Sequence, residues 1–519
     1  MAFLIATTVI ATTVGFRHSG RQPPAEMLDP VSLETNSWRI ANANRASLIV
    51  DADDYFQAGR QAMLAAKRRI MLIGWDFDAR IRLGGPSGLE GPLQLGDFVL
   101  WLVKRRPELE IYLLRWDIGA IRTLFRGTTI LTLIRWMWHD QIHTRLDAAH
   151  PTGASHHQKI VVIDDCFAFC GGIDMTSNRW DTREHRDRDP RRRSPGGKPY
   201  TPWHDTTTAL QGSVAAALGE LARERWLGAG GKRLQAVSVE TECWPANLAS
   251  DFDNVRVAVS RSMPAYRDRR PVLEIERVYL DLIARARRFI YAESQYFSSR
   301  RIAQAIACRL EQTDGPEVVL VNPVSSHGWL EPIAMDTARA RLFEALRRLD
   351  RHGRLRLYHP VTASGEAIYV HAKLMVVDDE VLHVGSSNMN NRSMRLDTEC
   401  DVTIDASLEG NAQATVGIAR IRSSLLAEHL DVSPDRIDDI FSKTGSLIQT
   451  IESLRSIGRS LISYQVPDLQ DVEKWLADNE VLDPNGPAEM LENLTQGKLL
   501  RGLRQRLTGL RSGGARNHS

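Results

Sequence analysis

One pattern occurs twice in this chain, and it limits the folds that the chain can adopt. The segment SHHQKIVVIDD at 155–165 resembles YVHAKLMVVDD at 369–379, so that a histidine, a lysine and an aspartate recur at the same spacing. The recurring residues are His157, Lys159 and Asp164 in the first copy and His371, Lys373 and Asp378 in the second. A long internal repeat indicates a duplicated structural unit, in which each copy supplies the same local structure.

The flanks of the two copies are also alike. Each copy is followed by a short apolar run and a glycine turn, at 171–174 in one half and at 385–388 in the other. Short apolar runs alternate with segments of helical period, which is typical of buried strands covered by helices. We therefore predict an α/β fold of two pseudo-repeated mixed-sheet α/β/α halves. The halves pack together with one active site at their interface, and a helical C-terminal tail follows them.

The repeat also places the domain boundaries. We expect an N-terminal extension over 1–37, a first half over 38–212, a connector over 213–265, a second half over 266–427 and a helical region over 428–519. The connector should hold one helix and then an irregular segment, and the last region shows no strand pattern.

Both ends of the chain carry segments that could contact a membrane. The apolar start, 1–16, lacks the basic residues that precede the apolar run of a secretory signal. It is also shorter than a membrane span, which needs about 20 apolar residues. We expect an extended terminus there rather than an export signal or an anchor. Near the other end, the basic segment 498–506 is expected to be a surface helix rather than a membrane-contacting one.

Charge and cysteine content narrow the classes of protein. The formal net charge is +2, so the chain has no global basic field for nucleic acid, and we expect no nucleic-acid partner. The five cysteines are odd in number and contain no Cys-x-x-Cys pair, which argues against a disulfide framework or a zinc site. We expect Cys166 and Cys170 to be small buried thiols.

The repeated residues suit an attack on a phosphodiester. Without a metal, this reaction needs a nucleophile, an acid for the leaving oxygen and positive charge around the phosphoryl oxygens. Histidine can supply the first two near neutral pH, and lysine supplies the third. On a strand, positions i and i+2 face the same side, so His157 projects with Lys159, and His371 projects with Lys373. Two such strand ends, brought face to face, would surround one phosphate.

With these residues the chain resembles the phospholipase D superfamily, whose signature is His-x-Lys-(x)4-Asp followed, six residues later, by Gly-Gly or Gly-Ser. Both copies match the signature, and the resemblance covers about 38–427. The segments 171–181, 202–205 and 293–297 are similar to the phospholipase branch rather than to nucleases.

The resemblance implies a covalent phosphatidyl-histidine, with His157 as the nucleophile and His371 as the acid and base. It further implies that the phosphoryl oxygens are bound by Lys159, Lys373, Asn388 and Ser386. No metal and no other cofactor is expected in the reaction.

Each histidine should have a carboxylate that fixes its tautomer and stabilises its cation. We assign Asp205 to His157 and Glu399 to His371, because each acid follows its histidine in the same half. The signature aspartates, Asp164 and Asp378, are counted among the catalytic residues, although an aspartate at the far end of an apolar strand also suits a structural turn.

The predicted function is that of a phospholipase D, which hydrolyses glycerophospholipids to phosphatidate and a head-group alcohol, or transfers the phosphatidyl group to an alcohol. The alternatives are a phosphatidyltransferase of the cardiolipin synthase kind and a catalytically inactive membrane-binding scaffold. The expected partner is a phospholipid at a membrane surface, and the expected location is cytoplasmic or peripheral to a membrane. Oligomerisation is not required, because one chain carries both motifs.

Three further segments have competing interpretations. The arginine-rich loop 183–198 is either a head-group-binding loop or a solvated one. The segment 121–138 is expected to be a core-facing helix rather than a membrane-inserting one, with Trp136 and Trp138 packing on a sheet. The acidic run 51–54 is expected to begin a helix rather than to bind calcium.

Overall fold

The first half of the chain alternates strands with helices. The computed structural model describes residues 31–32, 35–85, 89–116, 129–238, 243–325 and 331–466. The elements of the first half are β1 (Arg39–Val50), α1 (Ala52–Ala65), β2 (Arg69–Gly74), α2 (Leu95–Arg105), β3 (Glu110–Trp116), α4 (Thr129–Met137), β4 (Ile142–Asp147), β5 (Ile160–Ile163), β6 (Phe167–Gly171), β7 (Trp203–His204), β8 (Thr206–Gln211) and α5 (Ser213–Gly228). As predicted, the acidic run begins a helix, since Asp51 directly precedes α1.

The second half repeats this order. Its elements are β9 (Phe252–Met263), β10 (Val272–Leu273), α6 (Glu274–Arg285), β11 (Phe289–Ser294), α7 (Arg300–Leu310), β12 (Glu317–Val321), α8 (Glu331–Leu349), β13 (Leu355–Val361), β14 (Tyr369–Val370), β15 (Lys373–Val377), β16 (Val381–Gly385), the π-helix η1 (Arg392–Leu396), β17 (Glu399–Asp405) and α9 (Ala414–Leu430). They are followed by α10 (Pro434–Thr444), α11 (Leu447–Leu454) and β18 (Ser460–Ser463).

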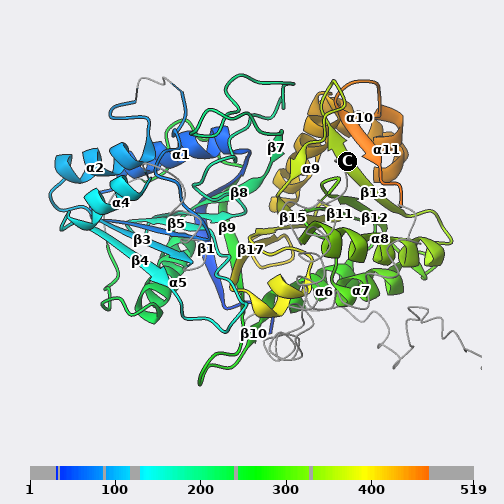
Figure 1. Cartoon of the computed structure of the whole chain (residues 1–519). Coiled ribbons are helices and arrows are strands. Elements are labelled where there is room, and N and C mark those ends of the chain that lie inside the picture. Colours follow the sequence, from blue (N-terminus) through cyan, green and yellow to red (C-terminus); the bar gives the residue numbers. More distant parts are fainter. Residues whose placement is uncertain are drawn as a thin grey trace, which may run out of the picture.

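One mixed sheet runs through both halves (Figure 1). Its order is β18-β13-β12-β11-β15-β16-β17-β9-β1-β8-β6-β5-β2-β3-β4, which is nearly symmetrical about the antiparallel β9–β1 pair. Figure 1 shows helices on both faces, with α1, α2 and α4 opposite α5 in the first half and α6, α7 and α8 opposite α9, α10 and α11 in the second. The α/β fold class and its two repeated halves are therefore confirmed.

Packing joins the halves as firmly as the sheet does. The largest hydrophobic cluster contains side chains of both halves, from β1 and α5 on one side to β17 and α9 on the other. Each half also has a cluster of its own, on the opposite face of the sheet. The strands β5 and β15 are buried along their whole length, which is why β5, and β15 after Lys373, are uninterrupted apolar runs.

Two segments are more regular than we expected. The connector 213–265 contains not only the predicted helix, α5, but also β9, which pairs with β1 and β17 at the centre of the sheet. The strand was missed because its polar positions, such as Arg256 and Ser260, interrupt the apolar pattern. The region after 428 likewise contains a strand, β18, which pairs with β13. It therefore does not form a separate tail as far as residue 466, and the basic segment 498–506 lies outside the described residues, as does the apolar start.

Cysteine pairing also differs from the expectation. Cys166 and Cys243 form a disulfide, with their Cα atoms 6.4 Å apart, so the bond ties the segment after α5 to the turn between β5 and β6. Sequence could not indicate the pair, because 77 positions separate its members. Cys170 is a buried free thiol, as predicted.

The segment 121–138, which we expected to be a core-facing helix, faces the core only in part. Trp136 on α4 is buried and its indole N–H donates to the Gly96 carbonyl, whereas Trp138, just beyond the helix, is 86% exposed. The first part of the segment, 121–128, lies outside the described residues. Among the described residues, no helix is both long and apolar enough to cross a membrane.

Candidate active site

The two motif histidines lie where the halves meet. His157 precedes β5, and its backbone N–H donates to the carbonyl of Thr398 in the second half at 2.9 Å. His371 lies between β14 and β15, and its N–H donates to the carbonyl of His204 in the first half at 2.7 Å. The short parallel pair of β14 and β7 extends this second contact. Each histidine is thus held by a strand of the opposite half.

The carboxylate partners are crossed relative to our assignment. His157 Nδ1 lies 3.0 Å from Glu399 Oε1, and His371 Nδ1 lies 2.7 Å from Asp205 Oδ2. We had assigned each acid to the histidine of its own half. The assignment was wrong because β7 and β14 run side by side across the interface, so the residue that follows β7 reaches the histidine that follows β14. Both carboxylates are fully buried, so each is positioned to fix the tautomer of one imidazole.

The two motif lysines are buried beside the histidines. Lys159 Nζ donates to the His157 carbonyl at 2.7 Å and lies 3.4 Å from Asp174 Oδ2. Lys373 Nζ donates to the His371 carbonyl and lies 3.4 Å from the side-chain oxygen of Gln295. The same local arrangement therefore recurs in both halves, as the spacing of the motif predicts.

The motif aspartates lie away from this centre. Asp164 follows β5, at the opposite end of that strand from Lys159, and its carboxylate accepts the backbone N–H groups of residues 67–69 at 2.6–2.8 Å. Asp378 does the same for residues 287–289. Listing these two aspartates as catalytic was therefore wrong. They fix the starts of β2 and β11, which flank the motif strands.

Ser386 and Asn388, the two other residues predicted to bind phosphate, differ from each other in their surroundings. The Ser386 hydroxyl donates to Glu399 Oε2 and accepts the backbone N–H of Cys400 at 3.0 Å, so it holds the carboxylate rather than facing an open site. Asn388 is buried, and its side-chain oxygen makes no hydrogen bond within the described part of the chain. A role for Asn388 in phosphate binding therefore stays a prediction.

The glycines after the first motif are required by close approach. A Cβ atom at Gly172 would overlap the carboxylate of Asp205, and one at Gly171 would overlap Thr207 on β8. In the second half, a Cβ at Gly385 would overlap Asp401. The glycine turn of the signature thus lets the carboxylate-bearing strand, β8 or β17, approach the strand that follows the motif strand, β6 or β16.

Sequence reasoning overlooked one cation of this site. The guanidinium of Arg179 lies 4.2 Å from the ring centroid of Trp203, and the Trp203 ring also lies 5.2 Å from the His371 ring. Its charge acts on His371 and on Lys373. From the sequence, Arg179 was included only as part of the phospholipase-like segment 171–181. The arginine-rich loop after it is not simply solvated, because His185 and Arg192 are buried in it.

Burial and concentrated positive charge shift the pKa values of the site. Burial, with the charges of Lys159 and Lys373, holds the pKa of His157 well below its usual range. Burial, then Lys373 and Arg179, lowers the pKa of His371 in the same way. Burial also lowers the pKa of Lys373 to about 7, against the opposing effect of Asp205. An arriving phosphate anion would neutralise these cations and raise all of these pKa values again.

A comparison with known families agrees with this geometry. A family model described as Phospholipase D matches residues 62–304 and 350–474, which is more than half of the chain. The chain belongs to the phospholipase D superfamily. The matched regions contain both motif copies, Asp205 and Glu399.

Its relatives in this superfamily are distant and mostly longer. Phospholipase D alpha 4 of Arabidopsis thaliana is 22% identical over 77% of this chain and 66% of its own length. Phospholipase D alpha 1 of Carica papaya is 24% identical over 78% and 66%, and phospholipase D A of Dictyostelium discoideum is 25% identical over 75% and 36%. The chain thus spans less than two thirds of the length of these relatives.

A solved structure supports the fold of this superfamily member. Phosphatidylserine synthase of Haemophilus influenzae Rd KW20 superposes with a TM-score of 0.51, covering 80% of this chain and 96% of the other. The two sequences are 14% identical, so the likeness concerns the fold alone.

Proposed function

We propose that this protein is a phospholipase D that cleaves glycerophospholipids through a covalent phosphohistidine. The observation that carries the proposal is the pair of motif histidines, each with a buried carboxylate on Nδ1 and each acted on by the same two lysines. A carboxylate on Nδ1 leaves Nε2 of each imidazole for chemistry.

In the first step His157 is the nucleophile. Its low pKa keeps the imidazole neutral, so the Nε2 lone pair can attack phosphorus. A phosphorus–nitrogen bond forms and the bond from phosphorus to the head-group oxygen breaks. His371 gives its Nε2 proton to that oxygen, and the head group leaves as an alcohol. Phosphate binding, which raises the pKa of His371, supplies the protonated form that this step needs.

In the second step the roles reverse. His371, now neutral, takes a proton from water, and the resulting hydroxide attacks phosphorus as the bond to His157 breaks. The products are phosphatidate and the regenerated enzyme, and one water is consumed in the whole cycle. If an alcohol takes the place of water, the product is a transferred phosphatidyl group.

The cations of the site support binding of the phosphoryl group. Lys159, Lys373 and Arg179 place three positive charges around the histidines, and we assign them the non-bridging oxygens. Ser386 positions Glu399, and Glu399 in turn positions His157.

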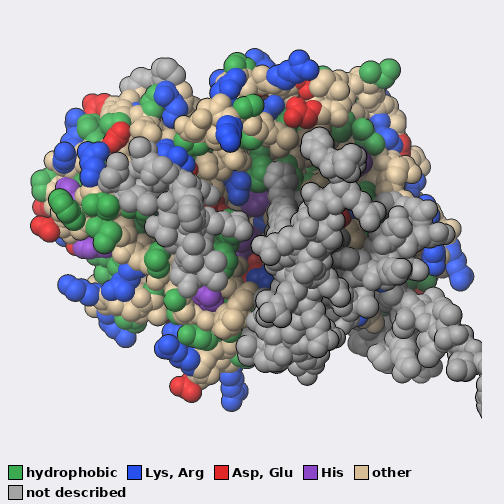
Figure 2. Space-filling view, viewed as in Figure 1, with side chains coloured by type: hydrophobic (Ala, Val, Ile, Leu, Met, Phe, Trp, Pro, Cys, Tyr) green, Lys and Arg blue, Asp and Glu red, His purple; other side chains and the backbone are tan. Residues whose placement is uncertain are grey.

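Two observations favour a lipid as the substrate. The named relatives are phospholipases D, although the chain spans less than two thirds of their length. In addition, α4 and the residue after it expose Ile134, Met137 and Trp138, by 41%, 68% and 86%. Such side chains can enter the interfacial region of a bilayer. On the face seen in Figure 2, basic side chains are dispersed over both halves and do not form one continuous basic surface.

The test is incubation of the purified protein with phosphatidylcholine vesicles and ethanol. We expect free choline and phosphatidylethanol from the wild type, and neither product from His157→Ala or His371→Ala. His352→Ala, which changes an exposed histidine, is the control and should keep full activity. If activity survives in either motif variant, the proposal is wrong. If the wild type cleaves phosphatidylglycerol and joins two phosphatidyl groups instead, the protein is a phosphatidyltransferase.

A further inference from the structure

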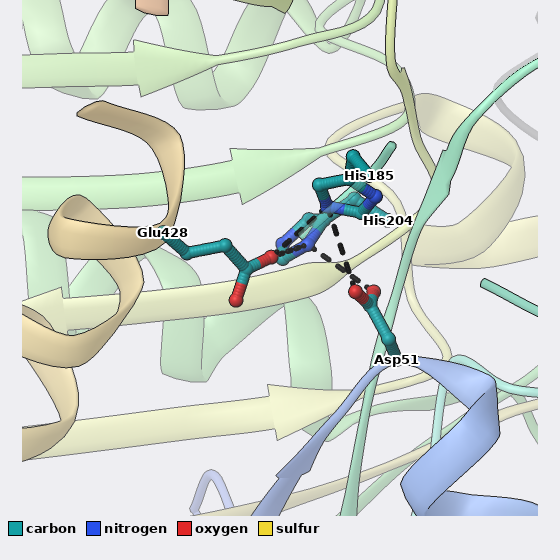
Figure 3. Close-up of side chains that lie close together, drawn as sticks. All are labelled: Asp51, His185, His204 and Glu428. Atoms are coloured by element: carbon teal, nitrogen blue, oxygen red, sulfur yellow. Dashed lines mark hydrogen bonds and ion pairs between the residues drawn. The ribbon is translucent and has the colours of Figure 1, made fainter. Parts of the chain in front are cut away.

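A second group of ionisable side chains lies buried next to the candidate active site. Its members are Asp51 at the start of α1, His185 in the arginine-rich loop, His204 on β7 and Glu428 on α9 (Figure 3). All four are at most 5% exposed, and one ligand atom from each lies within 4.8 Å of the others. The phosphohistidine mechanism uses none of them.

The geometry points to a structural zinc site formed by these four residues, and we propose that the folded protein holds one Zn²⁺ ion there. The donor set is two imidazole nitrogens and two carboxylate oxygens, which suits this ion. Four protein ligands complete a tetrahedral shell, so no position stays open for catalysis. Two carboxylates also balance the charge of the ion, which burial demands.

The separations between His185 and the two carboxylates match that shell. Zinc bound at about 2.0–2.1 Å in a tetrahedron requires its ligand atoms to be roughly 3.3 Å apart. His185 Nε2 lies 3.5 Å from Asp51 Oδ2 and 3.1 Å from Glu428 Oε1. His204 Nδ1 lies 2.7 Å from Glu428 Oε1, which is shorter than this edge, and 3.4 Å from Asp51 Oδ1, the oxygen on the other side of that carboxylate from Oδ2. Figure 3 shows the four side chains directed toward one another from separate elements.

Two of the donor atoms have no hydrogen bond. His204 Nδ1 and Asp51 Oδ2 are buried, and neither makes a hydrogen bond within the described part of the chain, although carboxylate and imidazole atoms are close by. A buried polar atom without a partner is costly, and native structures rarely contain one. A metal ion at the centre of the cluster would satisfy both atoms at once.

The opposite end of each ligand is fixed by another group, as in known metal sites. The second ring nitrogen of His185 lies 3.1 Å from Asp181 Oδ2, and that of His204 lies 2.7 Å from Glu293 Oε2. These are the carboxylate–histidine pairs that orient metal-binding imidazoles. Asp51 Oδ1 accepts the backbone N–H of residue 205 at 3.1 Å, and Glu428 Oε2 accepts from residue 183 at 2.6 Å.

The ion would fasten the two halves together behind the active site. Three ligands belong to the first half, and Glu428 belongs to the helix that follows β17 in the second half. His204 directly precedes Asp205, the carboxylate partner of His371, and its carbonyl accepts the N–H of His371. Loss of zinc should therefore loosen the position of Asp205 as well as lower stability.

Without a metal ion, protons would bind to the histidines of the cluster. Although burial alone would lower it, the carboxylates of Asp51 and its neighbours raise the pKa of His185 to about 9. A cluster without metal would therefore contain protonated histidines paired with carboxylates. Metal content distinguishes the two states directly.

The experiment measures zinc in the full-length protein, produced with zinc in the medium and dialysed against metal-free buffer. We expect one zinc per chain by mass spectrometry, and an X-ray absorption spectrum with nitrogen and oxygen but no sulfur neighbours. A strong zinc chelator should lower the melting temperature, and added Zn²⁺ should restore it.

Two variants locate the ion. His185→Gln should lose the zinc and the response of its melting temperature to chelator. His429→Gln is the matched control: His429 belongs to a neighbouring group with His204 and Glu293 but not to the four proposed ligands, so this variant should keep the zinc. A wild-type protein with only trace zinc and a melting temperature indifferent to zinc and chelator would overturn the proposal. Retention of zinc by His185→Gln, or its loss from His429→Gln, would overturn it too.

Discussion

The crossed pairing of histidines and carboxylates predicts different defects for two conservative substitutions. Asp205→Asn removes the carboxyl partner of His371, the acid and base, whereas Glu399→Gln removes that of His157, the nucleophile. Both changes keep the size of a fully buried side chain, so we expect small changes in stability and large ones in rate.

The size of the effect follows from the hydrogen bonds that are lost. A hydrogen bond to a charged group contributes about 1.5–3 kcal/mol, which corresponds to roughly 10- to 150-fold in rate. The amide of the new side chain can also donate to Nδ1 and so favour the wrong tautomer, and a loss of this kind reaches about 10⁴-fold in a histidine-dependent hydrolase. For a natural phospholipid we therefore expect kcat to fall between about 10- and 10⁴-fold in both variants.

A substrate with a nitrophenol head group separates the two variants. Nitrophenolate leaves without a proton, so the first step no longer needs His371. Asp205→Asn should release a rapid burst of nitrophenolate, with one equivalent of enzyme bound covalently at His157 and slow turnover afterwards. Glu399→Gln should show no rapid burst, because its nucleophile is disoriented. Stopped-flow absorbance measures the burst. Mass spectrometry of peptides prepared without exposure to acid locates the adduct.

One result would refute the reasoning about the pairing. If Glu399→Gln kept the rapid burst with its adduct on His157, Glu399 would not position that histidine. If the burst survived in Glu399→Gln with the adduct on His371, the direction of the reaction would be reversed and the crossed pairing would stand. Melting temperatures of both variants, close to that of the wild type, serve as the control for folding.

Three further predictions follow from the same structure. Burial lowers the pKa of Lys373 to about 7, so the residue loses its positive charge as the pH rises through that value. We therefore expect kcat/KM to decline above pH about 7. Lys373→Arg should move this decline to higher pH in its pH–rate profile. Gly172→Ala forces a Cβ against Asp205 and should lower kcat at least about tenfold. Gly196→Ala, where the Cβ would meet only the Ser194 hydroxyl at 3.9 Å, should not; steady-state assays compare the two. Cys243→Ser opens a loop of 77 residues and should cost up to about 4 kcal/mol in the free energy of unfolding, measured by denaturant titration beside the reduced wild type.

The fold could be predicted from the sequence because its strongest signals are local and occur twice. The apolar runs 160–163 in β5 and 374–377 in β15 are uninterrupted, and each run has a histidine and a lysine before it and a glycine turn after the next strand. Because the two patterns are so alike, they predict two similar halves that meet at the motif strands. Weak local signals failed, as in β9, where polar positions hide a strand at the centre of the sheet.

What could not be predicted depends on which segments meet across the interface. Distance along the chain suggested that Asp205 serves His157, but pairing of β7 with β14 brings it to His371. The four residues of the proposed zinc site come from positions 51 to 428 and show no metal-binding spacing in the sequence. From the sequence we expected no metal site and no metal in the reaction; the proposed ion departs from the first expectation and leaves the reaction mechanism unchanged.

The crossed pairs also bear on how a duplicated chain comes to have one active site. Asp205 precedes β8 and Glu399 begins β17, so the two acids occupy equivalent places in the two repeats, and each serves the histidine of the other repeat. Neither half alone contains a motif histidine together with its carboxylate. A single repeat would therefore be inactive and would need a second copy, related by an approximate two-fold axis, to complete both pairs. Fusion of two such copies keeps the β1–β9 contact permanent and frees each repeat to specialise, one toward the nucleophile and the other toward the acid and base.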